Sequence, residues 1–560
     1  MFANLPLVIR TATLGVGLVL MVLVSLPLWL NRHPVVGTSA TLRNSPLQIR
    51  IVQGLVAALC AVNLLFVLAA VVSHLGFPLH LNLMEGTVLQ HFDRAVQGLP
   101  IYPEPSPNFV PLAYNVGYYL LAKPFAWLFG TNLFTLRLVA LLGGLGSGAL
   151  VYRVVYEKTE SKGWGFIALG LFAAAYGVME AYLDTAHSDS WLLCMALLGT
   201  YLIDRKRSKR SHLLGLLALI ASFWFKQHGA LFVLGGLVYL FWCDGVPAGL
   251  GYALVAVLLG PVLYIYAGPV LFGAGYHFFT WFVPRHWSEL NISTFVRYFR
   301  FVSGSYLFLA LAALLFVLRM IWHERELLLE RVTLSRNTSG DLSSWHIQWL
   351  LAMLSGFMGT LDPGSANNVF ISLGTWCIIV GVWSAKYWLD KVRYNDRAII
   401  QRLQALGLLA SLGLFAYNPL NVIPSFQARA AYQDFIQTLH QIDGPVYAPF
   451  TAYIQDEGKL YPNAHWVALE DIVRGPKDDG RNAPETRRLL HDAIAPNGNA
   501  YLLTNMPIEQ MVPAMAFLGD YYVLDKDFGP RFVALEGLPG RFGHGYPQYL
   551  YRHKNNIGHA

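Results

Sequence analysis

The stretch NLMEGTVLQHFDRAVQGLPIYPEPSPNFVPLAYNVGYY, residues Asn82 to Tyr119, follows an apolar run at 51–72 that is long enough to cross a bilayer. It carries two carboxylates, Glu85 and Asp93, and then a group of prolines and aromatic residues. A carboxylate this close to a membrane span needs water, a charged partner or a function. We interpret the stretch as the cover of an active site, with Glu85 as the leading catalytic candidate.

The composition excludes a water-soluble globular protein. Of the 560 residues, 55% are hydrophobic and only 13% are charged, which is more apolar surface than a soluble fold of this length can bury. The four cysteines all lie in apolar runs, so neither a disulfide framework nor a zinc spacing is indicated. The first apolar run has no clear cleavage site, and we expect it to be a span rather than a signal peptide.

The sequence predicts a polytopic α-helical membrane protein with about twelve transmembrane helices. The expected spans are 8–30, 51–73, 133–152, 164–183, 190–203, 212–225, 228–243, 249–268, 301–321, 346–361, 367–385 and 399–417.

The net charge of +7 comes from Lys and Arg in short loops between spans, which indicates membrane orientation and not nucleic-acid binding. Basic groups near 32–50, 153–162, 205–210, 319–336 and 386–397 all fall on one side, which we take as cytoplasmic. The segment 109–129 would break this alternation if it spanned the membrane. We therefore expect it to lie along the outer surface, with its aromatic rings at the interface.

The unusual polar residues then all fall on the outer side. That side collects the first outer loop, 74–132, the turns at 184–189, 226–228 and 362–368, the stretch 269–300, and everything after residue 417. This convergence is the strongest functional signal in the sequence.

The composition changes at about Pro419, so we divide the chain into a transmembrane domain, 1–418, and a soluble α/β domain, 419–560. Strand-like pieces alternate with helix-like pieces in the second part. The expected strands are 446–448, 466–469, 501–504, 521–524 and 549–551, and the expected helices are 429–441 and 484–495.

Glu85 has two interpretations. While an acceptor hydroxyl attacks a sugar carbon, Glu85 acts either as a general base or as a charge that steadies a developing positive charge. Alternatively, it is a negative charge that caps the start of a helix. Asp93 lies about two helical turns further on and either shares the face of Glu85 or pairs with Arg94.

The turn Asp184-Thr-Ala-His187-Ser-Asp189 offers two carboxylates and a histidine between two spans. Asp189 either caps the following helix or faces Glu85, positions an acceptor or helps to bind a divalent cation. His187 is more commonly a solvated loop residue than a ligand.

The basic and amide residues of the outer turns suggest anion and sugar contacts. Lys226, next to Gln227 and His228, is flanked by apolar spans and either meets a lipid phosphate or extends to the headgroups. Arg285 and His286 are a second phosphate candidate. The amides of Asn367 and Asn368 lie in a turn and could contact a sugar or phosphate.

No Gly-rich phosphate loop, nucleotide-binding fingerprint, serine nucleophile elbow or zinc helix motif is present. The sequence therefore does not indicate an enzyme that binds soluble nucleotide sugars. A sugar transferred on the outer face should come from a lipid-linked donor.

Taken together, these motifs resemble the GT-C class of integral membrane glycosyltransferases, the branch with protein O-mannosyltransferases and the aminoarabinose transferase of lipid A. The resemblance covers about 75–370 and rests on Met-Glu85-Gly, the Gly-x-x-x-Tyr102-Pro element, the surface segment 111–129, the opening 130–138 of the next span, Asp189-Ser and Phe-Lys226-Gln-His-Gly. Two departures are the absence of paired prolines near 109–115 and the extra first span.

The resemblance implies a GT-C fold and inverting transfer of a sugar from a polyprenyl-phosphate donor to a lipid, glycan or protein acceptor. It matches Glu85 to the first-loop acid, Asp189 to the second-loop acid with Asp184 as an extra one, and Lys226 to the donor-side lysine. Further substrate contacts are expected from Asp93, Tyr102, Asn115, His187, Gln227, His228, Asn367 and Asn368. Metal use varies in this class, so a divalent cation is neither assigned nor excluded.

The expected location is the bacterial inner membrane, with the active site and the C-terminal domain in the periplasm. A transporter or flippase of a lipid-linked saccharide is the alternative from another class, but its mid-span polar residues or repeated broken helices are not clear here. A glycan ligase or polymerase, such as an O-antigen enzyme, is the second alternative and would use basic residues such as Arg285 and His286.

Overall fold

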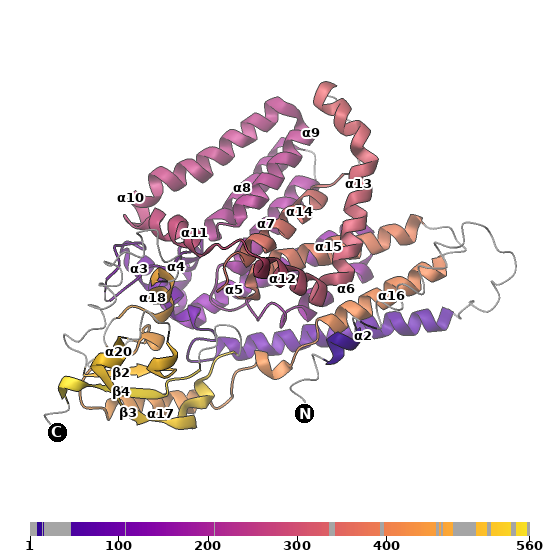
Figure 1. Ribbon diagram of the computed structural model, residues 1–560. Helices are drawn as coiled ribbons and strands as arrows, with labels where there is room; N and C mark the ends of the chain where they lie inside the picture. The colour runs from indigo at the N-terminus through magenta and orange to yellow at the C-terminus, as the bar shows by residue number, and fades with distance from the viewer. Residues whose placement is uncertain are drawn as a thin grey trace.

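Long helices make up most of the chain in the computed structural model (Figure 1). The structure describes residues 8–13, 15, 46–106, 108–205, 208–334, 342–391, 397–454, 459–460, 463–473, 500–511, 517–538 and 545–556. The main helices are α2 (Pro46–Leu75), α3 (Met84–Gln97), α4 (Gly117–Phe129), α5 (Leu133–Thr159), α6 (Lys162–Ala174), α7 (Asp189–Arg205), α8 (Lys209–Phe225), α9 (Gly229–Val257), α10 (Gly268–Phe272), α11 (Val283–Trp287), α12 (Ile292–Phe301), α13 (Leu307–Leu334), α14 (Ser344–Thr360), α15 (Ile371–Lys391), α16 (Arg397–Leu414), α17 (Ala428–His440) and α18 (Trp466–Val473).

Five helices in the described part are long and apolar enough to cross a membrane, which makes this a multi-pass membrane protein. They are Ile51–Leu75, Leu133–Thr159, Gly229–Phe272, Ile292–Glu324 and Asn367–Lys391. Helix α2 exposes a stripe of large apolar side chains, among them Val62, Leu65 and Val72. Such a stripe suits contact with lipid.

Helix α15 lies at the centre of the bundle and contacts α5, α6, α7, α13 and α14. Every residue from 371 to 382 is buried. Two glycines let neighbouring helices come close, because a Cβ at Gly381 would lie 2.8 Å from the Leu309 carbonyl oxygen and one at Gly374 would lie 2.4 Å from the Tyr306 ring. The close helix contact therefore depends on the missing side chains.

Three of the expected spans need comment. Helix α6 ends at Ala174, so the span expected at 164–183 is wrong in its second half; Glu180 and Ala181 there adopt left-handed φ angles of 53° and 60°. The span expected at 301–321 begins earlier, because α12 continues through the π-helix η4 (Val302–Tyr306) into α13. The break expected between 243 and 249 is confirmed, since Gly245 has φ 79° and ψ 172° and separates two helices.

Residues 8–13 and 15 of the first expected span, 8–30, are helical, and the rest of that span lies outside the described residues. Within the segment 109–129, only Gly117–Phe129 is helical; this is the short helix α4, which ends in exposed Trp127 and Leu128. Its position on the membrane surface stays a prediction.

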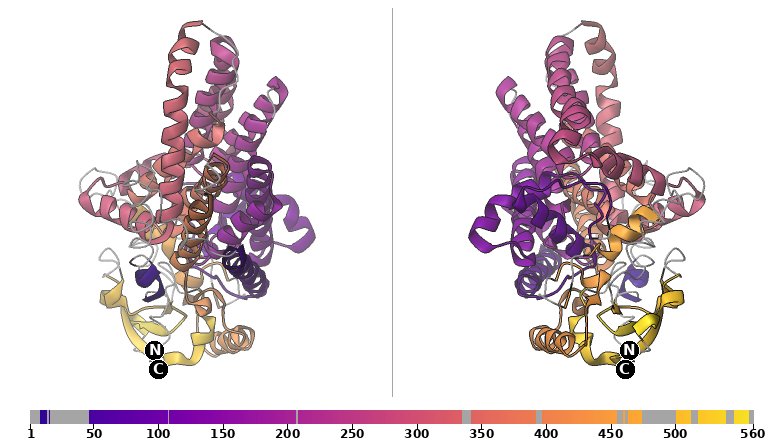
Figure 2. Two further views of the ribbon diagram at one scale, coloured as in Figure 1. Left: turned by 90° about the vertical axis from the view of Figure 1, so that its right-hand side faces the viewer. Right: turned by 90° about the vertical axis from the view of Figure 1, so that its left-hand side faces the viewer.

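Polar contacts tie the helices together at both ends of the bundle. At the end that carries the basic loops, Lys158 contacts Asp204 at 2.5 Å, and Asp204 accepts a hydrogen bond from Ser343 at 2.5 Å. These contacts join α5, α7 and the start of α14. The opposite end carries α3, α4 and the C-terminal sheet (Figure 1). Figure 2 shows that sheet at one end of the molecule, and the bend within α9 and the end of α13 at the other.

The C-terminal part forms a sheet of β1 (Val446–Tyr447), β2 (Tyr501–Thr504), β3 (Tyr522–Asp527) and β4 (Tyr549–His553). The strand order is β1-β2-β4-β3, with β1 and β2 parallel and the other pairs antiparallel. Four expected strands and the helix at 429–441 are confirmed, whereas the strand expected at 466–469 is wrong and is helix α18. A short apolar run fits either structure. The helix expected at 484–495 lies outside the described residues, and the domain boundary near 419 stays a prediction.

The C-terminal part covers the first outer loop. The Tyr453 hydroxyl contacts the backbone nitrogen and Nδ1 of His80 at 2.9 and 2.8 Å, and the Leu538 nitrogen donates to the Leu81 carbonyl at 2.6 Å. Helix α18 packs on α3. These contacts place the sheet and α18 over the start of α3.

We expect the substitution Gly381→Ala to weaken the packing of α15 on α13. Inserting a methyl group against backbone should cost about 1–3 kcal/mol, as overpacking does in other cores. Thermal unfolding of the purified protein in detergent measures this loss. The control is Gly407→Ala in α16, where an added Cβ meets nothing within 4 Å; equal loss in both variants would contradict the close-contact account.

Candidate active site

The first acidic residue of the outer loop forms a buried ion pair with α5. Glu85 and Arg137 are both fully buried, and the Arg137 guanidinium donates to both carboxylate oxygens, at 3.1 Å from Nε and 2.6 Å from Nη2. Glu85 lies in the first turn of α3 and Arg137 in the first turns of α5. This two-point contact is the strong geometry for an arginine–carboxylate pair.

Arg137 also holds the chain that connects α2 to α3. It donates to the carbonyl oxygens of His74 at 2.9 Å, Phe77 at 2.7 Å and Leu79 at 2.5 Å. Together with the two bonds to Glu85, these bonds use all five guanidinium N–H groups. The end of α2 and the irregular residues after it are therefore fixed around one side chain.

Glu85 extends the network to the second outer turn. Its oxygens accept from the backbone nitrogens of Leu81 at 2.6 Å and Ala186 at 2.7 Å. Burial opposes ionisation of this carboxyl, but the Arg137 charge and these hydrogen bonds outweigh it and hold the pKa of Glu85 below its usual range. The carboxylate is thus ionised and accepts four hydrogen bonds.

These contacts give Glu85 a clear positioning role. Glu85 has no exposed surface, and its two oxygens accept four hydrogen bonds. Its carboxylate can contact an acceptor hydroxyl only if one of the bonds from Arg137 or the backbone breaks. The helix-start interpretation describes part of this geometry, because Glu85 does lie in the first turn of α3. Its catalytic role stays a prediction.

Asp184 lies in a separate buried cluster. Its carboxylate contacts His74 Nδ1 at 2.7 Å and accepts from the Tyr176 hydroxyl at 2.6 Å. His74 Nε2 contacts the Val422 carbonyl at 2.7 Å, so the cluster joins the end of α2 to the start of the C-terminal part. These contacts indicate that Asp184 holds the fold together.

Asp189 and Lys226 form a second buried ion pair. The Lys226 Nζ donates to Asp189 at 2.8 Å and lies 5.2 Å from the centre of the Tyr114 ring. The other Asp189 oxygen accepts from the Asn368 side chain at 3.3 Å. Lys226 therefore turns inward instead of extending to the lipid headgroups.

A cavity of about 150 Å³ adjoins this second pair. Its lining brings together segments that are far apart in the sequence: Met84, Ala113, Tyr114, Lys226, Gln227, His228, Pro284, Trp287, Ser288, Met358, Gly359, Asp362, Ser365, Ala366, Asn368, Val369, Val467 and Asp471. Both partners of the Asp189 carboxylate, Lys226 and Asn368, line it. We call it the lysine cavity.

The side chains beside Lys226 shape this cavity. Gln227 donates to the carbonyls of Ala113 at 2.7 Å and Thr280 at 2.8 Å, which ties the 226–228 turn to two other segments. Trp287 donates to the Asp471 carbonyl at 3.1 Å, so α11 and α18 contact each other and both contribute to the cavity wall. The C-terminal part is thus a wall of the candidate site.

Other expected substrate contacts serve as internal supports. Tyr102 is fully buried and donates to the Tyr114 carbonyl, and Asn115 donates to the Phe223 carbonyl at 2.7 Å. His187 is buried, not solvated as its common interpretation predicts, and contacts Asn82 at 2.9 Å. Burial lowers the pKa of His187 to about 4, so the ring is neutral at physiological pH.

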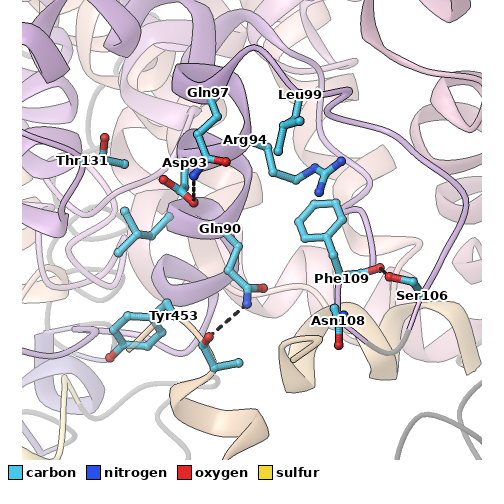
Figure 3. A pocket seen from close by; sticks show the side chains of 12 residues that line it. Gln90, Asp93, Arg94, Gln97, Leu99, Ser106, Asn108, Phe109, Thr131 and Tyr453 are labelled. Atoms are coloured by element: carbon cyan, nitrogen blue, oxygen red, sulfur yellow. Dashed lines mark hydrogen bonds between the residues drawn. The ribbon is translucent and has the colours of Figure 1, made fainter. Parts of the chain in front are cut away.

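Four expected site residues lie away from the lysine cavity. Asp93 accepts from Gln97 at 2.8 Å and lines a different cavity of about 630 Å³, shown with Arg94 and Tyr453 in Figure 3. Arg285 is exposed. His286 contacts the Phe282 carbonyl at 2.6 Å, and neither it nor Arg285 lines the lysine cavity. Asn367 lines a third cavity.

Several residues of the site were not predicted from the sequence. Arg137 lies in the opening 130–138 of an expected span, and a lone arginine in an apolar helix is itself a signal for a buried partner. Tyr114, Trp287 and Asp471 carry no local signal, because their place in the cavity depends on how distant segments pack. Among the described residues, no group of three or more His, Cys, Asp or Glu side chains is placed to hold a metal ion.

Comparison with known proteins gives a distant structural likeness. No protein-family model and no curated protein matches the chain. Two solved structures are similar, both crystal structures of ArnT from Cupriavidus metallidurans. The apo state has a TM-score of 0.46 and 14% identity over 89% of this chain and 97% of that chain, and the form bound to undecaprenyl phosphate has 0.45 and 13% over 89% and 98%.

We expect Glu85→Gln to destabilise the fold strongly. The neutral amide leaves the buried Arg137 charge unpaired and turns an N–H group toward other donors, which should cost about 3–5 kcal/mol. Thermal unfolding in detergent is the measurement. The control is Asp434→Asn, which breaks an exposed pair with Arg531 and should cost no more than about 1 kcal/mol. Similar unfolding temperatures for both variants would contradict the proposed role of the buried pair.

The neutral state of His187 predicts acid sensitivity. Its pKa is about 4 in the folded chain against 6.5 ordinarily, so the unfolded chain binds the proton more tightly. The contribution of the neutral His187 ring to the free energy of unfolding is then fully present above about pH 6.5. It falls as the pH drops toward 4, by up to about 1.4 kcal/mol per pH unit. Unfolding temperatures at several pH values should show a smaller decrease for His187→Gln than for the unchanged protein. An identical decrease would show that His187 does not contribute.

Proposed function

We propose that this chain is an inverting glycosyltransferase that moves a sugar from a polyprenyl-phosphate-linked donor to an acceptor hydroxyl. The acceptor is a glycolipid, a cell-envelope glycan or a protein, on the periplasmic face of the bacterial inner membrane. The observation that carries the proposal is the buried Asp189–Lys226 pair beside the lysine cavity. The resemblance of the surrounding motifs to GT-C enzymes points to the same reaction.

Lys226 is the group suited to the donor phosphate. Lys226 lines the cavity with 6% of the residue exposed, and the described contacts of its ammonium are Asp189 and the Tyr114 ring. An ammonium has three N–H donors, so a phosphate oxygen can bind while the contact to Asp189 is kept. In a site with little water, that charge stabilises the negative charge that develops on the departing phosphate.

Asp189 is the group suited to the acceptor. The acceptor oxygen attacks the sugar carbon that bears the phosphate, the carbon–oxygen bond to the phosphate breaks, and the phosphate leaves with the electron pair. The hydroxyl proton goes to a carboxylate, and attack from the opposite face inverts the configuration. Asp189 accepts from Lys226 and from Asn368, and the remaining lone pairs of its two oxygens can take the hydroxyl proton while the contact to Lys226 is kept.

Glu85 is the alternative base, because it matches the first-loop acid of the GT-C resemblance. In the present geometry it acts through Ala186, whose backbone nitrogen it binds at 2.7 Å. That bond positions the turn that ends at Asp189. We therefore propose Glu85 as a positioning residue and Asp189 as the catalytic carboxylate, and the two assignments predict different outcomes for their variants.

The C-terminal part is suited to guiding the acceptor. Val467 and Asp471 of α18 line the lysine cavity opposite the 226–228 turn. An acceptor that reaches Asp189 therefore passes next to α18. The carboxylate of Asp471 and the apolar residues of the wall fit a sugar or glycolipid headgroup better than a nucleic acid.

We expect Asp189→Asn and Lys226→Gln each to reduce sugar transfer by about 10²–10⁴-fold, the usual contribution of a general base or a charge-stabilising group. Transfer from a radiolabelled polyprenyl-phosphate sugar to extracted cell-envelope acceptors measures the rate. Asp390→Asn, at the far end of the bundle where Asp390 pairs with Lys386, is the control and should keep full activity.

The same assay distinguishes whether Asp189 or Glu85 is the catalytic base. If Asp189 is the base, Glu85→Gln loses activity only in proportion to the folded protein that it loses. A Glu85→Gln protein that folds normally but does not transfer sugar, together with an active Asp189→Asn, would move the base to Glu85. Full activity in all three variants would refute the proposed site.

A further inference from the structure

A second basic cavity, of about 750 Å³, lies behind the lysine cavity. The short helix η5 (Asn367–Phe370) separates the two, because Asn368 lines the lysine cavity and Asn367 lines the other. Its lining comes from the N-terminal helix, the irregular turn after α6, α12, η4 and η5: Arg10, Thr11, Gly177, Val178, Glu180, Ser293, Val296, Arg297, Arg300, Phe301, Ser303, Gly304, Ser305, Asn367 and Phe370. We call it the arginine cavity.

The arginine cavity carries an excess of positive charge. Three guanidinium groups, those of Arg10, Arg297 and Arg300, share it with the single carboxylate of Glu180. The Arg10 Nε donates to the Ala416 carbonyl at 2.7 Å, which orients that side chain. Arg300 is exposed at the cavity mouth. Even with one arginine neutralised by Glu180, two positive charges remain for an anion.

The remaining polar lining fits a phosphate group. Ser305 adds a hydroxyl donor beside the guanidinium groups, whereas the hydroxyls of Ser293 and Ser303 donate to Asn291 Oδ1 and to the Arg300 carbonyl. An arginine can bind two phosphate oxygens at once. A Cβ placed on Gly304 meets nothing within 4 Å, so the chain leaves open space there. Ser303, Gly304 and Ser305 belong to the single-turn π-helix η4, a distortion that often marks functional sites.

The surroundings of the cavity indicate that the phosphate belongs to a lipid. Helix α12 exposes Ile292, Val296 and Phe299 with exposed fractions of 79%, 57% and 62%, next to Arg297 and Arg300. The same helix begins the apolar stretch Ile292–Glu324, which is long enough to span the membrane. Arginines at the start of a span with apolar neighbours lie at the level of lipid headgroups.

We propose that the arginine cavity binds the phosphate group of an anionic membrane lipid, at a site separate from the lysine cavity. The two sites are linked through Arg297, which donates to the Asp362 carbonyl at 3.1 Å and to the Ser365 hydroxyl at 2.9 Å. Asp362 and Ser365 line the lysine cavity. Both terminal nitrogens of Arg297 donate to oxygens of residues 362–366, so Arg10 and Arg300 are the groups left to hold the phosphate. A lipid bound beside Arg297 therefore steadies the wall of the candidate active site.

Native mass spectrometry of the full chain in detergent, titrated with phosphatidylglycerol, tests the proposal. We expect Arg300→Gln and Arg10→Gln each to weaken lipid binding by about 10-fold or more, as the loss of a charged hydrogen bond does. Arg300 is exposed, so its variant should fold normally, and Arg300→Lys should bind with intermediate affinity. The control is Arg319→Gln in α13, where Arg319 lies over the Trp388 ring near the opposite end of the same helical stretch.

Two competitors identify the source of the phosphate. A galactosyl diacylglycerol, which has no phosphate, should not displace phosphatidylglycerol, and inorganic phosphate should displace it only weakly. If inorganic phosphate displaces phosphatidylglycerol at the same concentration as the lipid, the ligand of this site is a soluble anion and the lipid proposal is contradicted. Unchanged lipid binding in both Arg10→Gln and Arg300→Gln would overturn the site. The assay measures binding without sugar transfer, so its failure leaves the proposed function untouched.

Discussion

The buried pair of Glu85 and Arg137 is the constraint on which the rest of the site depends. Two charges without solvent are costly unless every donor and acceptor is used, and here the five N–H groups of Arg137 and four acceptor positions of Glu85 are all used. The pair therefore specifies one arrangement of irregular backbone between α2 and α3. Without the pair, the carbonyls of His74, Phe77 and Leu79 would lose their donor, Arg137. The second outer turn would lose its acceptor, Glu85.

The position of the second ion pair follows from the first. The bond from the Ala186 nitrogen to Glu85 fixes the turn just before α7, and α7 begins with Asp189. Asp189 then meets Lys226 and Asn368, which come from two other parts of the bundle. A rigid, fully bonded pair thus supports a less saturated pair, of which Lys226 lines a cavity. This division between support and reaction is common in sites that hold their chemistry to within a fraction of an ångström.

Much of the fold and part of the site could be predicted from the sequence. Counting spans and basic loops placed Glu85, Asp189 and Lys226 on one side, and the structure brings the turns that carry them together. The partners could not be predicted, because Arg137 and Asn368 are distant in sequence and only packing brings them close. The local pattern also gave wrong predictions where it was ambiguous. The four apolar residues that begin at Trp466 predict a strand, but they belong to helix α18. The apolar run after Lys162 predicts a helix to residue 183, but helix α6 ends at Ala174.

The central claim is that the charge of Lys226, held by Asp189 at the covered end of the bundle, receives the phosphate of a lipid-linked sugar donor. An electron cryomicroscopy structure of the full chain with a polyprenyl phosphate bound tests it most directly. The account predicts phosphate density within hydrogen-bond distance of the Lys226 Nζ, with the Glu85–Arg137 pair unbroken. Phosphate density elsewhere, or a Glu85 carboxylate released from Arg137 and turned toward the ligand, would contradict it.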